Sequence, residues 1–120
     1  MKPLQPGKTV VVVDDEDALC EILRVVFEHE GYSVAVARNG VEALATLRSM
    51  PVKPCLVILD LLMPVLDGNA VYREMKKDPA LAGVNVVVTT SEPARAPSGV
   101  FIMKKPVALE LMLDTVRKCC

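Results

Sequence analysis

The 120-residue sequence has no tryptophan, few other aromatic residues and a single histidine. Aromatic side chains make up 3% of the chain, and 14 basic residues nearly balance 15 acidic ones. A platform that stacks nucleic-acid bases needs aromatic side chains, and a stripe that binds phosphates needs an excess of positive charge. We therefore expect no direct binding to nucleic acid.

Long hydrophobic runs are also lacking, although 52% of the residues are hydrophobic. No run approaches the roughly 18 residues that cross a bilayer. Residues 1–8 lack the apolar segment of a secretory signal. We expect a cytoplasmic protein without membrane contact, with residues 1–120 in one domain and residues 1–8 as a flexible N-terminal segment.

The four cysteines do not have the C-x-x-C spacing of metal sites and redox motifs. Cys20 and Cys55 lie in apolar segments, where a thiol usually packs as a small hydrophobic group in a reducing compartment. We expect these two to be structural. Cys119 and Cys120 end the sequence, and we expect them to be more exposed to oxidation.

Short apolar runs alternate with segments of helical periodicity. We expect strands at residues 9–13, 32–37, 55–59, 84–89 and 100–103. Helices fill the intervals: Asn39 and Asp67 are expected to start two of them, and the last helix is expected to begin at Pro106. The alternation predicts an α/β fold: a doubly wound, five-stranded parallel sheet of the flavodoxin-like order 2-1-3-4-5.

One interval departs from this pattern. Residues 91–99 contain two prolines and no apolar stripe, so we expect the fourth helix to be shortened or missing, with at most a single turn. Apolar side chains beside the fourth and fifth strands would then be partly exposed, which favours self-association or a dedicated partner. We hypothesise a homodimer through this face.

Acidic residues follow two of the expected strands. Asp14 and Asp15 come after the first strand, and Asp60 comes after the third. In the 2-1-3-4-5 order, ligands bind beyond the carboxyl ends of these strands. Three carboxylates there would repel one another unless a cation neutralised them, and carboxylate oxygens suit Mg²⁺. Taken alone, Asp14 and Asp15 are explained equally well as an acidic helix N-terminus.

Polar residues also follow the last two strands. Thr90 and Lys105 supply a hydroxyl group and a positive charge, the groups that stabilise a phosphoryl group during transfer. An aspartate can accept that group as an aspartyl phosphate. Asp60 is the best candidate, because it stands where the third strand turns into a long loop.

Four motifs resemble the receiver domains of two-component response regulators, the CheY-like family. They are V-V-D-D-E at residues 12–16, D-L-L-M-P-V-L-D-G at 60–68, V-T-T-S-E at 88–92 and K-K-P at 104–106. The resemblance covers residues 10–116. It implies a signalling domain rather than an ordinary enzyme, with a sensor histidine kinase or phosphotransfer protein as donor and a downstream effector protein as target.

The resemblance also implies roles for single residues. Asp60 would be the phosphoacceptor, and Thr90 and Lys105 would bind the phosphoryl group. The Mg²⁺ ligands would be Asp14, Asp15, Asp60 and the backbone carbonyl of Leu62.

Two further expectations concern the end of the fifth strand. The resemblance implies a cis peptide bond between Lys105 and Pro106. Ile102 stands where the family usually has an aromatic residue that turns inward on activation, and Phe101 beside it should point to the opposite face. We therefore expect no switching through an aromatic side chain.

Three alternatives compete with this interpretation. A pseudo-receiver would bind partners without phosphorylation, but the complete set of site residues opposes it. A small aspartate-nucleophile phosphatase resembling the haloacid dehalogenases needs a second aspartate two positions after the nucleophile, where Leu62 stands. A flavin-binding protein needs a hydroxyl-rich phosphate loop in place of Asp14 and Asp15.

Overall fold

The computed structural model describes residues 8–120, in which strands and helices alternate. The predicted flexible segment at residues 1–8 lies outside the described residues, except for Lys8. The strands are β1 (Thr9–Val13), β2 (Ser33–Ala37), β3 (Leu56–Asp60), β4 (Val86–Thr90) and β5 (Phe101–Lys104). The helices are α1 (Asp17–His29), α2 (Gly40–Ser49), α3 (Gly68–Lys77) and α4 (Leu109–Cys119). None of these helices is long and apolar enough to span a bilayer.

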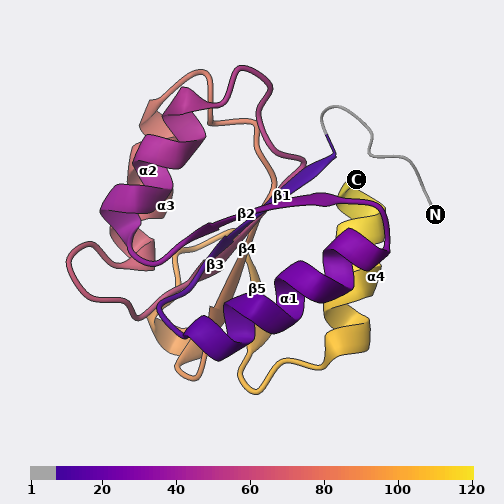
Figure 1. The fold of residues 1–120 in the computed structure, drawn as a ribbon. Coiled ribbons are helices and arrows are strands. Elements are labelled where there is room, and N and C mark those ends of the chain that lie inside the picture. Colours follow the sequence, from indigo (N-terminus) through magenta and orange to yellow (C-terminus); the bar gives the residue numbers. More distant parts are fainter. Residues whose placement is uncertain (1–7) are drawn as a thin grey trace.

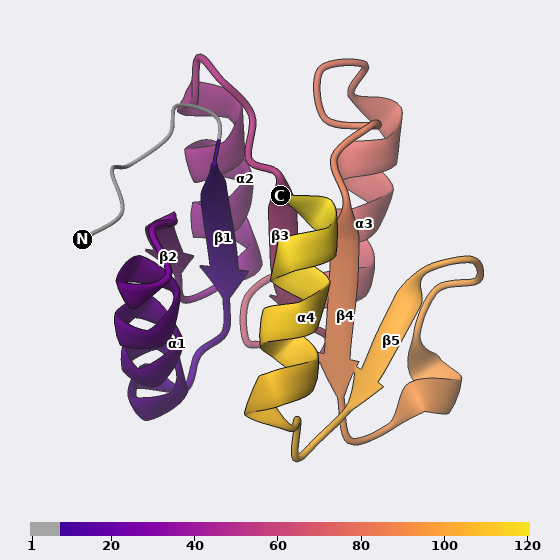
Figure 2. The ribbon, with the colours of Figure 1, turned by 90° about the vertical axis from the view of Figure 1, so that its right-hand side faces the viewer.

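The five strands form one parallel sheet in the order β2-β1-β3-β4-β5. Helices α1 and α4 cover one face of this sheet, and α2 and α3 cover the other (Figure 1). The predicted fold class and strand order are confirmed. Because all strands run in one direction, their carboxyl ends share one edge of the sheet (Figure 2).

The core forms on both sides of the central strands, because successive side chains of a strand point to opposite faces. Val11, Val13, Val57 and Leu59 pack under α2 and α3. The alternate residues Val10, Val12, Leu56 and Ile58 pack under α1 and α4. Burial on both faces explains why β1 and β3 are continuous apolar runs in the sequence.

Two helices begin at the N-cap residues that the sequence suggests. The side chain of Asn39 accepts a hydrogen bond from the Glu42 N–H at 2.9 Å, and that of Asp67 accepts one from the Ala70 N–H at 3.0 Å. Gly68 follows Asp67 because a Cβ atom there would lie 2.6 Å from the carbonyl oxygen of Asp60. The Asp-Gly pair therefore starts α3 and lets it approach the end of β3.

The last helix begins later than predicted, at Leu109 instead of Pro106. The Lys105–Pro106 peptide bond is cis, as the resemblance implied. Ala108 is the N-cap residue and has an extended backbone. The first α4 side chain buried in the core is Met112, so packing defines the helix only from about one turn before that residue.

The crossover between β4 and β5 contains one short 3₁₀ turn, η1 (Pro93–Arg95), which confirms the prediction of at most a single turn. The side chain of Asn69 in α3 donates a hydrogen bond to the Arg95 carbonyl at 3.0 Å and fixes the turn. On β5, Phe101 is 55% exposed and Ile102 is also exposed. Apolar surface is therefore uncovered beside the shortened crossover, as expected.

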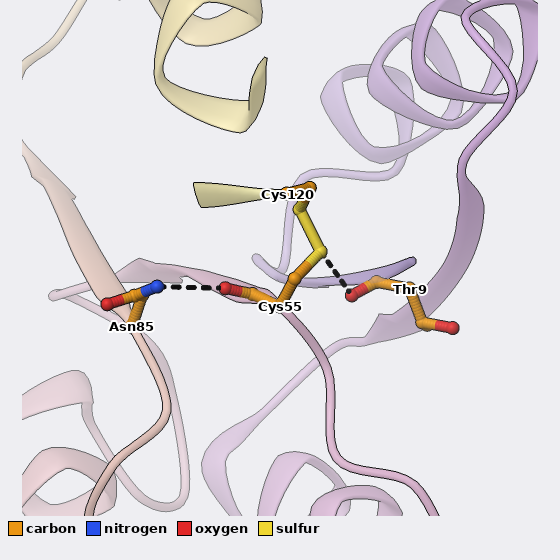
Figure 3. Close-up of a disulfide and its surroundings, with 4 residues drawn as sticks. All are labelled: Thr9, Cys55, Asn85 and Cys120. Atoms are coloured by element: carbon orange, nitrogen blue, oxygen red, sulfur yellow. Dashed lines mark hydrogen bonds between the residues drawn. A yellow bond between two sulfur atoms is a disulfide. The ribbon is translucent and has the colours of Figure 1, made fainter. Parts of the chain in front are cut away.

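One prediction about the cysteines is wrong. Cys20 is a buried free thiol, as expected, but Cys55 forms a disulfide with Cys120 (Figure 3). Their Cα atoms are 5.4 Å apart, within the range that a disulfide requires. The two residues are separated by 65 positions, and the pair becomes visible only when the fold brings the end of α4 to the start of β3.

Candidate functional site

Three aspartates meet at the carboxyl ends of β1 and β3. Asp14, Asp15 and Asp60 each offer a carboxylate oxygen, and these oxygens lie within 4.8 Å of one another. Asp14 and Asp60 are 3% and 4% exposed, whereas Asp15 is open to solvent. The predicted convergence of these carboxylates is therefore present in the structure.

Lys105 brings a positive charge to the two buried carboxylates from the end of β5. Its Nζ atom lies 3.2 Å from Oδ2 of Asp14 and 3.3 Å from Oδ1 of Asp60. The Lys105 N–H donates to the Thr90 carbonyl at 2.8 Å, which ties the lysine to the end of β4. The charge of Lys105 offsets that of one carboxylate, so the cluster keeps a net negative charge.

The protonation equilibria reflect this arrangement. Burial, reinforced by the negative charge of Asp14, raises the pKa of Asp60 from 3.8 to about 6, and Lys105 and the Leu62 N–H offset only part of this rise. For Lys105, burial lowers the pKa, but the carboxylates of Asp14 and Asp60 together raise it by more, so its pKa lies above the ordinary value. Lys105 therefore stays protonated at neutral pH. The ionised form of Asp60 is less stable in the folded protein than in water, which lowers the free energy of unfolding.

Two backbone N–H groups that sequence reasoning missed orient the polar side chains. Thr90 is buried, and its Oγ1 atom accepts a hydrogen bond from the Glu92 N–H at 2.9 Å. Oδ1 of Asp14 accepts one from the Glu16 N–H at 2.9 Å. Both bonds span two residues, as aspartate and threonine commonly form in turns. The sequence signal for such a bond is an aspartate or threonine at the end of a strand.

The loop after Asp60 carries an unusual backbone. The Leu62 N–H lies close enough to the Asp60 carboxylate to lower its pKa. The role of the Leu62 carbonyl as a metal ligand stays a prediction. Val65 has φ of 72° and is 82% exposed. Positive φ is unfavourable for a β-branched residue, so this loop is strained beside the acidic cluster. Nothing in the sequence pointed to that strain.

A cavity of about 530 Å³ adjoins the polar site between α1 and α4. Its walls are mostly apolar and include Ile22 of α1 and Leu109 of α4, while Asp14 and Lys105 lie at its polar side. The two helices run side by side over this face of the sheet (Figure 1). The site therefore has an apolar surface next to its charged groups.

The donor set fits a hard divalent cation. The three clustered side chains offer carboxylate oxygens, the donors that Mg²⁺ prefers. A dication would also relieve the repulsion between Asp14 and Asp60. The geometry thus combines a candidate cation site, a buried carboxylate and a lysine at one sheet edge.

Comparisons with known proteins agree with this geometry. Residues 10–116 match the family described as the response regulator receiver domain. Response regulator MprA of Mycobacterium sp. (strain KMS) is 34% identical over 113 residues, which cover 90% of this chain and 48% of that protein. DNA-binding response regulator MtrA of Mycobacterium leprae (strain TN) is 37% identical over 83 residues, which cover 69% of this chain and 35% of that protein. The chain spans less than half the length of these relatives.

Solved structures show the same fold. Response regulator protein TrrA from Thermotoga maritima, in complex with Mg²⁺ and BeF, superposes with a TM-score of 0.81 at 29% identity, covering 94% of this chain and 99% of that one. The signal receiver domain of a histidine kinase from Syntrophus aciditrophicus gives 0.82 at 27% identity, covering 93% and 89%.

Proposed function

Because this chain belongs to the family of response regulator receiver domains, we propose that it is a phosphoacceptor of two-component signalling. Asp60 accepts a phosphoryl group from a phosphohistidine and later loses it by hydrolysis. The observation that carries this proposal is the position of the Lys105 ammonium group, which lies within 3.3 Å of both Asp14 and Asp60 at the acidic sheet edge.

The chemistry follows from the side chains. An oxygen of the Asp60 carboxylate attacks phosphorus, the phosphorus–nitrogen bond of the donor breaks, and the imidazole nitrogen keeps the electron pair. With a pKa of about 6, Asp60 is mainly ionised and nucleophilic at pH 7. Lys105 and the Thr90 hydroxyl bind the phosphoryl oxygens, for which Lys105 exchanges part of its present ion pairing.

Mg²⁺ is the proposed cofactor. Asp14, Asp15 and Asp60 would hold it, together with the carbonyl of Leu62, and when bound it would offset the charge of the carboxylates and the phosphoryl group. The likeness to the TrrA complex with Mg²⁺ and BeF supports this choice.

The proposed donor is a sensor histidine kinase or phosphotransfer protein, and the proposed location of this chain is the cytoplasm. The apolar walls of the cavity between α1 and α4 give such a partner a surface to contact beside Asp60. The absence of direct nucleic-acid binding by this chain stays a prediction. The DNA binding stated for MtrA concerns a protein of which the matched segment is 35%.

The surface of β5 is the proposed output face, where a second copy of the chain packs. The exposed side chains of Phe101 and Ile102 and the short crossover support this assignment. Analytical ultracentrifugation over a concentration series tests it. Phe101→Ser should weaken self-association, and a wild-type chain that stays monomeric at high concentration would contradict it.

The central experiment is phosphorylation by acetyl phosphate with Mg²⁺, followed by intact mass. We expect the mass of one phosphoryl group to be added to the wild type and not to Asp60→Asn. Asp114→Asn, which removes an exposed carboxylate of α4, is the matched control and should react as the wild type does. A product that forms equally in Asp60→Asn would exclude Asp60 as the acceptor, and no product at all would favour a pseudo-receiver.

A further inference from the structure

The disulfide between Cys55 and Cys120 joins the chain before β3 to the end of α4, and Figure 2 shows the C-terminus beside the start of β3. Cys55 directly precedes β3, which ends at Asp60. Cys120 directly follows α4, whose other end comes a few residues after Lys105. The bridge therefore joins the distal end of β3, whose near end carries Asp60, to the distal end of α4, whose near end follows Lys105 in the chain.

The first residues of α4, before Met112, are held weakly. Leu109 is 41% exposed, Leu111 is exposed too, and the N-cap residue Ala108 makes no side-chain hydrogen bond to the helix. The cavity of about 530 Å³ separates the first turns of α4 from α1, so dispersion contacts are lost there. The buried side chains of α4 are Met112 and Val116. With two side chains of α4 buried in the core, the covalent attachment at the distal end adds strongly to the position of the helix.

At that distal end, the disulfide is the strong attachment. Arg117 of α4 also pairs with Glu30 after α1 at 2.5 Å, but Arg117 is exposed and such surface ion pairs contribute little. Both bridged cysteines keep some exposed surface, so the bridge is not sealed inside the core. The bridge is therefore both important for the position of α4 and open to reduction.

Cys55 is positioned by contacts that do not depend on the bridge. Its N–H donates to the Thr9 carbonyl at 3.0 Å. The Asn85 side chain donates to its carbonyl at 3.3 Å (Figure 3). Its Sγ atom lies 3.3 Å from the same Thr9 oxygen. A disulfide sulfur carries no proton, but the thiol formed on reduction does and can donate to that oxygen. Opening the bridge thus frees Cys120 and α4 while β3 keeps its place.

We propose that the Cys55–Cys120 bridge is a thiol-reducible latch on α4, and that opening it lets α4 move over the cavity beside Lys105. A thiolate from solution attacks Sγ of Cys120, the disulfide bond breaks, and the Cys55 thiolate leaves and takes a proton from water. A second thiol then attacks the mixed disulfide, which releases Cys120 as a thiol and leaves the external reagent oxidised. The effect on phosphorylation of Asp60 rests on the proposed function.

The latch is tested by hydrogen exchange of the 120-residue chain before and after treatment with dithiothreitol. We expect amides of α4 to exchange at least about tenfold faster after reduction, and amides of α3 to be unchanged. Cys120→Ser should exchange as the reduced wild type does without any reductant. Cys119→Ser removes the neighbouring thiol, keeps the bridge and should behave as the wild type. Equal α4 exchange in the oxidised and reduced wild type would overturn the latch.

The link to the site is tested by the rate of phosphorylation by acetyl phosphate with Mg²⁺. We expect the reduced chain to react at least about threefold more slowly, because Lys105 is less firmly placed when α4 moves. Faster α4 exchange with equal phosphorylation rates would overturn this link. If Asp60 is phosphorylated in neither state, the proposed function fails, while hydrogen exchange still decides whether the latch exists.

Discussion

At the amino ends of the strands the chain is cross-linked and a lysine binds neutral carbonyl groups, whereas at the carboxyl ends two carboxylates are buried against each other. Lys53 donates hydrogen bonds to the carbonyls of Leu47 and Met50 at 2.8 and 2.7 Å, and Cys55 is bridged to the end of α4. At the other end, burial and a like charge act on Asp60. The two ends of one sheet therefore make opposite contributions to stability.

This difference shows which part of the fold lowers the free energy of unfolding. A sequence that specifies one structure satisfies local rules nearly everywhere and departs from them at functional sites. Asp60 and Val65 are such departures, one electrostatic and one in the backbone. Replacing them should stabilise the protein, and replacing residues at the amino ends should destabilise it.

The largest effect is expected for Asp60→Asn, measured by urea unfolding without Mg²⁺. The pKa of Asp60 is raised in the folded state, so the carboxylate costs nothing below its unfolded pKa and costs progressively more as pH rises through the folded value of about 6. The difference between about 6 and 3.8 corresponds to about 3 kcal/mol at high pH. Asp60→Asn should therefore be more stable than the wild type by about 2–3 kcal/mol at pH 7.5.

The pH dependence separates this effect from a general change in packing. The stability gain should vanish below about pH 4, where the wild-type carboxyl group is protonated in both states. On the proposal that the cluster binds Mg²⁺, millimolar Mg²⁺ should reduce the gain at pH 7.5, because a ligand that binds the folded wild type stabilises it. A gain of equal size at pH 3.5 and pH 7.5 would contradict the electrostatic origin and remove this contrast between the two ends.

The sequence predicted the parts of this contrast that depend on local pattern. Buried strands were recognised from short apolar runs, and the strand order placed Asp14, Asp60 and Lys105 at one edge. Asn39 and Asp67 marked helix starts because N-capping is local chemistry.

Features that depend on long-range packing were missed. Cys55 and Cys120 are 65 positions apart in the sequence, and only the complete fold brings them together. The start of α4 at Leu109 is set by where its side chains reach the core. The preference of proline for the first position of a helix carries no information about this packing. The strained φ of Val65 follows from the path of the loop around Asp60, and a valine gives no hint of it.

A smaller gain is expected for Val65→Asn. Asparagine tolerates positive φ far better than a β-branched residue, and the side chain is 82% exposed, so little packing is lost. We expect a stability increase of about 1 kcal/mol at any pH between 5 and 8. Val65→Thr keeps the β-branch and adds a hydroxyl group, so it should show no gain. Equal gains for both variants would trace the effect to polarity instead of backbone strain.

The smallest effect is expected at the amino end, for Lys53→Met. Methionine keeps most of the aliphatic chain but leaves the Leu47 and Met50 carbonyls at the end of α2 without the ammonium group. We expect a loss of about 0.5–1 kcal/mol in urea unfolding, with little dependence on pH because the acceptors are neutral. Lys77→Met removes an exposed lysine that pairs with Glu74 at 3.4 Å, and it should cost close to nothing. If Lys53→Met instead stabilised the protein, an unfavourable contact would exist at the amino end too. Destabilising contacts would then not be confined to the edge that carries Asp60.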